Sequence, residues 1–343
     1  MSLRSSEKQR VSSCPAADAI ARAVIARFRG ISKDCAAIED ATSQMVLAGI
    51  VAIKGNDMHV ISLAVGNKFN ATGEKHSNRV RDCHAEVLAR RAFKLWLLKQ
   101  YMSRENNSEF FEKTTDNVLK PHEGIKWVLY VSSCPCGNAC IRRWGDSPKE
   151  IFDYSLDSLE MAKDKPHPAF HPHSQKEGQT AISMKGQSTV LSCSDKILRW
   201  NVLGLHGIRL SGIVTERILL DGIVIGRKFV RKHAERAFCC RLSSKKIPEK
   251  LKNSTNHPSL MCTALKLDDG AIKAEEGATF TENVIWWNTG SPKIETIDGT
   301  QGLTQNGDIS ELAPSKLYGG NIPEPQSDLV DLSRVLDSQM RLL

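Results

Sequence analysis

The chain has 343 residues, of which 41% are hydrophobic and 25% are charged, and its formal net charge is +8. A chain of this length can bury a sizeable core and form one large domain or two ordinary ones. No apolar run approaches the roughly 20 residues that a membrane span requires, which argues against a transmembrane protein.

The ten cysteines bear on the compartment in which the protein works. The start of the chain is polar and shows no apolar segment of the signal-peptide kind, so we expect a cytoplasmic or nuclear protein. Thiols are kept reduced in those compartments. The cysteines are therefore expected to be free or to bind metal rather than to form disulfides.

Charge is distributed unevenly along the chain. Residues 268–343 contain 13 acidic and 5 basic residues, a net charge of −8, which leaves +16 for residues 1–267. A basic body favours a polyanionic partner such as nucleic acid, because binding releases counterions. A basic face that is simply solvated is the alternative explanation.

The first part of the chain predicts a helix followed by a hairpin. Residues 1–14 are polar and are expected to be disordered. In residues 16–29, apolar side chains recur at helical spacing, and Gly30 ends the pattern. Residues 45–53 and 58–65 are apolar runs rich in β-branched residues, separated by a turn, and they predict two paired strands.

The middle of the chain predicts strands that alternate with helices. Residues 104–123 have the composition of a loop, and residues 125–133 form a predicted strand that ends just before Cys136. Residues 145–187 are rich in Pro, His, Lys and Ser and are expected to be an insertion or a mobile loop. Residues 137–143 and 194–202 predict helices, and the backbone N–H groups at the start of the first are expected to point at the Cys136 thiolate.

The last part of the chain gives weaker signals. Residues 217–225 contain one or two predicted strands, residues 228–242 a basic helix, and residues 283–287 a last strand. Residues 249–278 are predicted to be irregular. Beyond Thr289, the Gly, Pro and acidic content predicts little packing.

The chemistry of the chain centres on His84 and Glu86, two residues apart where a polar run gives way to an apolar, helix-compatible run. If a helix begins near Asp82, the imidazole can bind a metal while the carboxylate beside it handles protons. A lone pair of this kind is a weak signal, because such a histidine is more often a satisfied structural residue.

Two cysteines downstream strengthen the metal hypothesis. Catalytic zinc sites keep three protein ligands and one water, and His84, Cys136 and Cys193 give that number. The zinc deaminases of nucleobases combine H-x-E with P-C-x-x-C. Here the next cysteine, Cys140, stands one residue too far along for that spacing, so Cys193 is our choice for the third ligand.

Three stretches together match a known pattern. They are His84-Ala85-Glu86 with Arg90-Arg91, Pro135-Cys136-Gly137, and residues 192–204, Ser-Cys-Ser-Asp-Lys-Ile-Leu-Arg-Trp-Asn-Val-Leu-Gly. They resemble the adenosine-to-inosine RNA deaminase family over roughly residues 49–242. The resemblance implies an α/β fold with a mixed central sheet of the cytidine-deaminase type, flanked by helices. It also implies a deaminase domain over residues 15–288.

We expect the chain to resemble the branch of tRNA-specific adenosine deaminase 1, because too few residues precede the hairpin in this sequence for a double-stranded-RNA-binding domain. This resemblance implies that the chain converts the adenosine immediately 3′ of the anticodon, position 37 of tRNA-Ala, to inosine. Hydrolysis would take place at C6 of a flipped-out adenine, with Glu86 protonating N1 and then the departing amine. Asn67 and Lys68 match the family's segment near the target nucleotide.

The resemblance also implies a buried inositol hexakisphosphate. The residues that match family positions around this ligand are Asp82, Arg90, Arg91, Lys196, Arg199 and Trp200. The spacing agrees, since Arg90 and Arg91 share one predicted helix, and Lys196 and Arg199 lie about one turn apart on another. Such a cluster of cations would repel itself without a polyanion. A solvated basic face is again the alternative.

The C-terminal part departs from the family pattern. The family continues into helices that supply further Lys and Tyr ligands to the inositol phosphate. Residues 289–343 are instead predicted to be an acidic, poorly ordered tail, with Ser315-Lys316-Leu317-Tyr318 as the one matching fragment. A non-catalytic RNA-binding paralogue, an inactive splice form and a structural zinc protein therefore remain rival hypotheses. We expect a monomer that binds tRNA and neither DNA nor membranes.

Overall fold

The structure is a computed structural model that describes residues 14–32, 46–69, 78–137, 139, 191–243, 247–265, 283–291 and 294–342. Residues 1–13 of the predicted disordered N-terminus and the predicted insertion at residues 145–187 lie outside this part of the chain. None of the described helices is long and apolar enough to cross a membrane.

Within the described residues, eight strands form one mixed sheet in the order β12-β11-β10-β2-β1-β7-β8-β9. The pairs from β12 to β7 are antiparallel, whereas β7, β8 and β9 run parallel. The strands are β1 (Leu47–Lys54), β2 (Asp57–Val65), β7 (Ile125–Ser133), β8 (Gly222–Arg227), β9 (Ser259–Cys262), β10 (Asn283–Asn288), β11 (Glu295–Asp298) and β12 (Leu303–Thr304). This mixed sheet confirms the predicted fold class.

The strands in the middle of the sheet are buried on both faces. β1 pairs with β2 as the predicted hairpin, and β7 confirms the predicted strand at residues 125–133. Successive side chains of a strand point to opposite faces. Ala48 and Ile50 of β1 accordingly join one core, and Leu47 and Val51 join the other.

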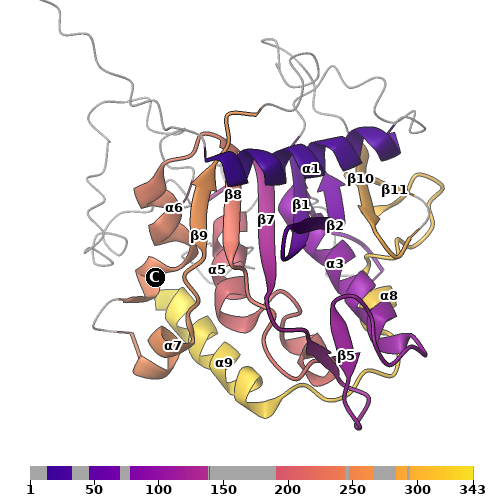
Figure 1. The fold of residues 1–343 in the computed structure, drawn as a ribbon, viewed down its shortest axis with the longest axis vertical. Coiled ribbons are helices and arrows are strands. Elements are labelled where there is room, and N and C mark those ends of the chain that lie inside the picture. The colour runs from indigo at the N-terminus through magenta and orange to yellow at the C-terminus, as the bar shows by residue number, and fades with distance from the viewer. Residues whose placement is uncertain are drawn as a thin grey trace, which may run out of the picture.

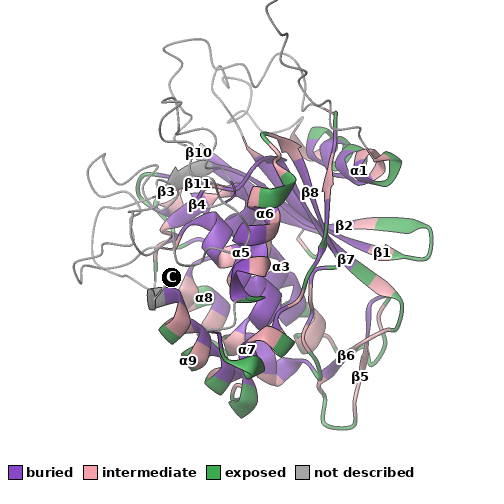
Figure 2. Cartoon of the chain, turned by 90° about the vertical axis from the view of Figure 1, so that its left-hand side faces the viewer, coloured by how far each residue is buried: buried purple, intermediate pink, exposed green. Residues whose placement is uncertain are grey.

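Helices cover both faces of this sheet (Figure 1). α1 (Pro15–Ser32) lies across one face, and its apolar stripe confirms the predicted helix. α3 (Ala85–Met102) and α5 (Cys193–Leu203) pack on the opposite face. Figure 2 shows that α3 and α5 are buried over most of their length, whereas α1 keeps an exposed outer side.

Shorter elements surround the sheet. β3 (Asn67–Phe69) pairs with β4 (Asp82–His84), and β5 (Phe111–Lys113) pairs with β6 (Leu119–Pro121) inside the segment predicted to be a loop. The predicted basic helix at residues 228–242 is divided between α6 (Arg231–Phe238) and the 3₁₀ helix η4 (Cys240–Ser243). The predicted irregular segment contains α7 (Glu249–Ser254) as well as β9. Another 3₁₀ helix, η3, spans Ile208–Ile213.

The prediction of a poorly packed region beyond Thr289 is wrong. This region contributes β11 and β12 to the sheet and forms α8 (Pro314–Tyr318) and α9 (Ser327–Leu342). α9 buries a row of apolar side chains against α5 and α7: Leu329, Leu332, Leu336 and Met340. Because these residues recur every three or four positions, they form one apolar face of the helix. The composition of the whole region beyond Thr289, with its many acidic residues, does not reveal this face.

Candidate active site

β4 delivers His84 to the start of α3. His84 caps this helix, which begins at Ala85 rather than near Asp82 as predicted. The Ala85 N–H donates to the Gly66 carbonyl at 3.0 Å, which ties the start of the helix to the end of β2. Glu86 is the second residue of the helix, and its exposed fraction is only 3%. Glu86 is therefore buried, whereas His84 is half-buried, with 12% of its side chain exposed.

A glycine brings Cys136 to the start of α5. Gly137 has a φ of 97°, which favours glycine, and a Cβ at this position would lie 2.1 Å from Ser192 Oγ. The close approach lets the Cys193 N–H donate to Cys136 Sγ at 3.4 Å. The predicted helix at residues 137–143 falls mostly outside the described residues, and this N–H comes from α5 instead.

The first turn of α5 is fixed by a capping box. The Asp195 N–H donates to Ser192 Oγ, and the Ser192 N–H donates to Asp195 Oδ2, each at 3.2 Å. The other carboxylate oxygen of Asp195 forms a buried ion pair with Arg241 at 2.5 Å. Removing one partner of such a pair costs about 3–5 kcal/mol. Cys193, between Ser192 and Asp195, is therefore held firmly.

The three predicted metal ligands come together. One ligand atom from each of His84, Cys136 and Cys193 lies within 4.8 Å of the other two. One imidazole nitrogen and two sulfurs form a usual donor set for zinc, and three protein ligands leave a fourth position for water. The residues therefore fit a catalytic zinc ion. Cys134 is not a member of this group, and its thiol donates to the Ala139 carbonyl at 3.3 Å.

A buried carboxylate orients the metal-binding histidine. Asp82 Oδ1 lies 2.7 Å from His84 Nδ1, and Asp82 Oδ2 pairs with Lys196. Because Nδ1 is engaged, Nε2 is the nitrogen that the ring offers to a metal. Burial works against charge on the ring, but Asp82 outweighs it and raises the pKa of His84 to about 10. Burial likewise opposes the charge of Asp82, yet Lys196 and His84 hold its pKa well below its ordinary value.

Glu86 is close enough to act electrostatically on all three ligands. Burial and Cys136 raise the pKa of Cys193, and the Glu86 carboxylate adds to that rise. A hydrogen bond from Cys193 lowers the pKa of Cys136 to about 7, although burial and Glu86 oppose the change. Burial lowers the pKa of His84, whereas Asp82, Cys136 and, least of the three, Glu86 raise it. The predicted acid–base residue thus lies beside the predicted ligands.

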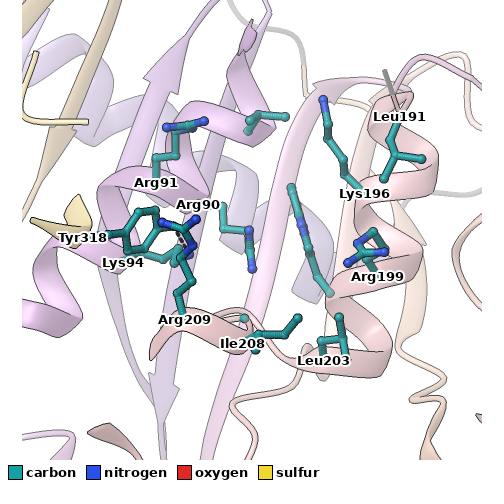
Figure 3. Close-up of a pocket in the computed structure, with 13 residues that line it drawn as sticks. Arg90, Arg91, Lys94, Leu191, Lys196, Arg199, Leu203, Ile208, Arg209 and Tyr318 are labelled. Carbon is teal, nitrogen blue, oxygen red and sulfur yellow. Dashed lines mark hydrogen bonds between the residues drawn. The ribbon is translucent and has the colours of Figure 1, made fainter. Parts of the chain in front are cut away.

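A cavity of about 340 Å³ lies between α3, α5 and η3 (Figure 3). Sites for small molecules commonly have roughly 300–1,000 Å³. Among the described residues, its lining has six basic side chains and no acidic one: Arg90, Arg91, Lys94, Lys196, Arg199 and Arg209. Trp200 and Tyr318 complete the polar and aromatic part of the lining. We call this the cation cavity.

The cation cavity gathers most of the residues predicted to bind the inositol phosphate. The predicted Arg90, Arg91, Lys196, Arg199 and Trp200 all line it. The sixth, Asp82, is outside the lining and reaches it through its ion pair with Lys196. The structure thus brings all of the predicted positions to one place.

Aromatic rings organise the cations. The Arg90 guanidinium lies 5.0 Å from the centre of the Trp200 ring, and the Arg209 guanidinium lies 4.9 Å from that of Tyr318. The Lys94 ammonium donates to the Tyr318 hydroxyl, and Figure 3 shows Lys94, Arg209 and Tyr318 gathered on one side of the cavity. Burial lowers the pKa of Arg90 to about 10 and that of Lys94 to about 8.

The lining fits a polyanion. Arg90 Nε is buried without a hydrogen-bond partner, although another nitrogen of this guanidinium donates to a backbone carbonyl. Lys196 pairs with Asp82, and Arg199 pairs with Asp337 of α9, so carboxylates from outside the lining already balance two of the cations. A ligand with several phosphate groups would balance the rest and accept from their N–H groups. The residues therefore fit the implied inositol hexakisphosphate.

Three basic or aromatic side chains of this lining were not among the predicted ligands: Lys94, Arg209 and Tyr318. Lys94 follows Arg90 by four residues and Arg91 by three, so helical spacing alone places it on the same face of α3. Tyr318 belongs to the fragment that resembles the family's C-terminal region. Arg209 lies on η3, which no sequence signal connects with the other cations.

Asn67 and Lys68, predicted to lie near the target nucleotide, belong to β3. The backbone of β3 pairs with β4, so that Asn67 stands opposite His84 and Lys68 opposite Cys83. The segment therefore borders the strand that carries the metal-binding histidine.

Comparisons with known proteins place this sequence in a family. Residues 62–318 match the model of the adenosine-deaminase (editase) domain. The mouse double-stranded RNA-specific adenosine deaminase is 29% identical over 305 residues, which are 78% of this chain and 24% of that protein. The tRNA-specific adenosine deaminase 1 of Schizosaccharomyces pombe is 28% identical over 277 residues, 70% of this chain and 66% of that protein. The tRNA-specific adenosine deaminase 1 of Drosophila melanogaster is 27% identical over 227 residues, which are 61% of this chain and 55% of that protein.

The chain thus spans about a quarter of the double-stranded-RNA enzyme and between about half and two thirds of the tRNA enzymes. Because these identities are so similar, they do not choose between the two kinds of RNA substrate. The matched range contains the metal ligands, Glu86 and all residues that line the cation cavity. Since it covers well over half of the sequence, the chain belongs to the adenosine-deaminase (editase) domain family.

Proposed function

We propose that this chain is a zinc-dependent enzyme that converts adenosine to inosine in tRNA by hydrolysis. The observation that carries the proposal is the meeting of His84, Cys136 and Cys193 beside the buried Glu86. A structural zinc site has no need of an acidic side chain that it does not bind. A carboxylate in this position is what general acid–base catalysis requires.

The residues suggest how the reaction proceeds. Zinc held by His84, Cys136 and Cys193 would supply an acidified water, because the metal lowers the pKa of water to about 7. Glu86 takes the proton of this nucleophile and transfers it to N1 of the adenine, which makes C6 more electrophilic. The remaining hydroxide oxygen bonds to C6. Glu86 then takes the second proton from the new C6–OH group and passes it to the amino group, so that the C6–N bond breaks, ammonia leaves and the C6 carbonyl of inosine forms. Water and adenosine are consumed, inosine and ammonia are formed, and Glu86 returns to its starting state.

Burial of the site favours an unpaired nucleotide as the substrate. Cys193 and Glu86 are almost wholly buried, so an adenine stacked inside a duplex cannot reach them. Turning a base out of the stack costs least where it is not paired. The adenosine next to the anticodon lies in a loop and meets this condition, and we propose it as the target.

We further propose that the cation cavity holds inositol hexakisphosphate as a structural cofactor. The ligand would neutralise side chains of α3, α5 and η3 together, and Tyr318 would join α8 to the same site. Lys196 lines this cavity and pairs with Asp82, which in turn contacts His84. Occupancy of the cavity would therefore help to position the metal-binding histidine.

The test is to incubate purified, zinc-loaded protein with a panel of tRNA transcripts and with double-stranded RNA, and then to sequence the products for A-to-G changes. We expect changes in tRNA immediately 3′ of the anticodon, and no change with the Glu86→Gln variant. Editing confined to double-stranded RNA would contradict the choice of tRNA and retain the deaminase. Zinc-loaded protein that forms no inosine in any RNA would favour the non-catalytic paralogue.

A further inference from the structure

Three side chains outside the deaminase site come together at the surface. Cys239 directly follows α6, Cys240 begins η4, and His257 lies between α7 and β9. One ligand atom of each lies within 4.8 Å of the other two. The group repeats the donor set of the first site, one imidazole nitrogen and two sulfurs, at a different place in the fold.

The separations are those of a zinc site. Cys239 Sγ lies 3.5 Å from Cys240 Sγ, which lies 3.8 Å from His257 Nδ1. With Zn–S bonds of about 2.3 Å and Zn–N bonds of about 2.0–2.1 Å, tetrahedral geometry places two sulfurs about 3.8 Å apart and a sulfur and a nitrogen about 3.6 Å apart. These two separations would change by only a few tenths of an ångström when the ion binds, and Cys239 Sγ lies within 4.8 Å of the imidazole. The Cys239 thiol, which donates to the Glu235 carbonyl at 3.3 Å, would give up that hydrogen bond.

The backbone holds His257 in place. The neighbouring Asn256 donates its N–H to the Asn201 carbonyl at 2.8 Å and its side-chain amide to the Leu220 carbonyl at 2.6 Å. The Ser259 N–H donates to the Asp221 carbonyl at 2.9 Å on the other side of the histidine. The segment that carries His257 is thus anchored at both ends.

The cysteines are anchored to the same helix. The Asn201 side chain of α5 donates to the Phe238 carbonyl at 3.0 Å, directly before Cys239. The Leu242 N–H donates to the Cys239 carbonyl at 3.1 Å, which closes the turn that carries Cys240. Because Asn201 contacts both the cysteine segment and the histidine segment, the fold preorganises all three ligands.

Exposure distinguishes this group from ordinary packing of thiols in a core. Cys239 is buried, Cys240 is half-buried and His257 is exposed. The group therefore opens towards solvent, where water or another ligand can complete four-coordinate zinc. If the two cysteines only packed in the core, that packing would not explain why the exposed imidazole of His257 approaches Cys240.

We infer that Cys239, Cys240 and His257 form a second metal site, which binds zinc or a similar thiophilic divalent cation and joins the α6–η4 corner to the segment before β9. Arg241 gives the site a structural consequence. It directly follows Cys240, and its ion pair with Asp195 supports the first turn of α5, which carries Cys193. The inference does not depend on the proposed function, since it concerns metal content and stability rather than deamination.

The test measures the zinc content of the purified full chain by inductively coupled plasma mass spectrometry, after dialysis against metal-free buffer. We expect two zinc ions per wild-type chain and one after His257→Gln or Cys240→Ser. Cys136→Ser, which alters the first site, should also leave one, and Cys136→Ser combined with His257→Gln none. Cys262→Ser and His122→Gln serve as matched controls that keep two.

A wild-type chain with a single zinc ion that His257→Gln does not remove would overturn the inference. His257 is exposed, so its replacement should leave folding intact even if Cys136→Ser does not fold. A vicinal disulfide between Cys239 and Cys240 is the rival outcome. It would lower the mass of the denatured, unreduced chain by about 2 Da, because oxidation removes two hydrogens. Finding it in protein purified without oxidant would also overturn the metal site.

Discussion

The metal centre and the cation cavity are neighbours along α5, yet their charges are balanced in different ways. At the metal centre, Asp82, Glu86 and two thiols surround His84. The cation cavity brings six basic side chains together without an acidic residue among the described residues of its lining. The first site can therefore form as the chain folds, whereas the second needs an anionic ligand to remove its internal repulsion.

Asp82 is the point at which the two sites meet. One of its carboxylate oxygens contacts His84 of the metal centre, and the other contacts Lys196 of the cation cavity. Changes confined to one site should therefore leave the other intact, while changes at Asp82 should affect both.

The largest effect is expected from Glu86→Gln. Loss of the acid–base group should lower the rate of deamination by about 10²–10⁴-fold, while zinc content and the unfolding temperature stay unchanged because Glu86 is not a ligand. Single-turnover kinetics and metal analysis measure the two quantities. Glu123→Gln, at an exposed position, is the matched control. A normal rate, or loss of zinc, would show that Glu86 has another role.

Asp82→Asn should have the next largest effect. The carboxamide is neutral and cannot support His84 and Lys196 as the carboxylate does, so zinc affinity should fall by about 10–100-fold. Competition with a chelator of known affinity measures it, with the exposed Asp116→Asn as the control. Binding of inositol hexakisphosphate should change as well, because Lys196 loses its partner. Unchanged zinc affinity would show that Asp82 does not couple the metal centre to the cation cavity.

Lys94→Met should weaken the binding of inositol hexakisphosphate by about tenfold or more, because a hydrogen bond to a charged group contributes roughly 1.5–3 kcal/mol. Zinc content should not change, since Lys94 has no contact with the metal ligands. Calorimetric titration measures the affinity, and the exposed Lys232→Met is the control. Equal losses in both variants would indicate unspecific attraction to a basic surface.

The smallest effect is a pH dependence of that binding. Burial lowers the pKa of Lys94 from 10.5 to about 8, so its ammonium is charged at pH 7 and loses its proton as the pH rises through 8. Burial raises the pKa of Tyr318, whereas Lys94 lowers it, so the phenol and the ammonium titrate as one hydrogen-bonded pair.

Affinity for the polyanion should therefore fall between pH 7 and pH 9, by at most about tenfold per pH unit for each proton involved. Lys94→Arg should reduce this dependence, because a guanidinium remains charged. Titrations at several pH values measure it. An affinity that stays constant over this range would contradict the assignment of Lys94 to the ligand.

The metal centre was more predictable from sequence than the rest of the site. His84 and Glu86 form a local motif, and the two cysteines adjoin a recognisable strand and helix. Arg209 reaches the cation cavity only through tertiary structure, which no local pattern encodes. α9 was missed because the Gly, Pro and acidic content of the whole region beyond Thr289 predicts little packing, although the apolar residues of α9 itself recur at helical spacing.

The most direct test of the account is a crystal structure with diffraction data collected at the zinc absorption edge. We predict an anomalous peak at about 2.0–2.1 Å from a His84 ring nitrogen and about 2.3 Å from the sulfurs of Cys136 and Cys193, with the Glu86 carboxylate beside it and not bound. No peak between these three residues, or a Glu86 carboxylate turned away from them, would contradict the central claim.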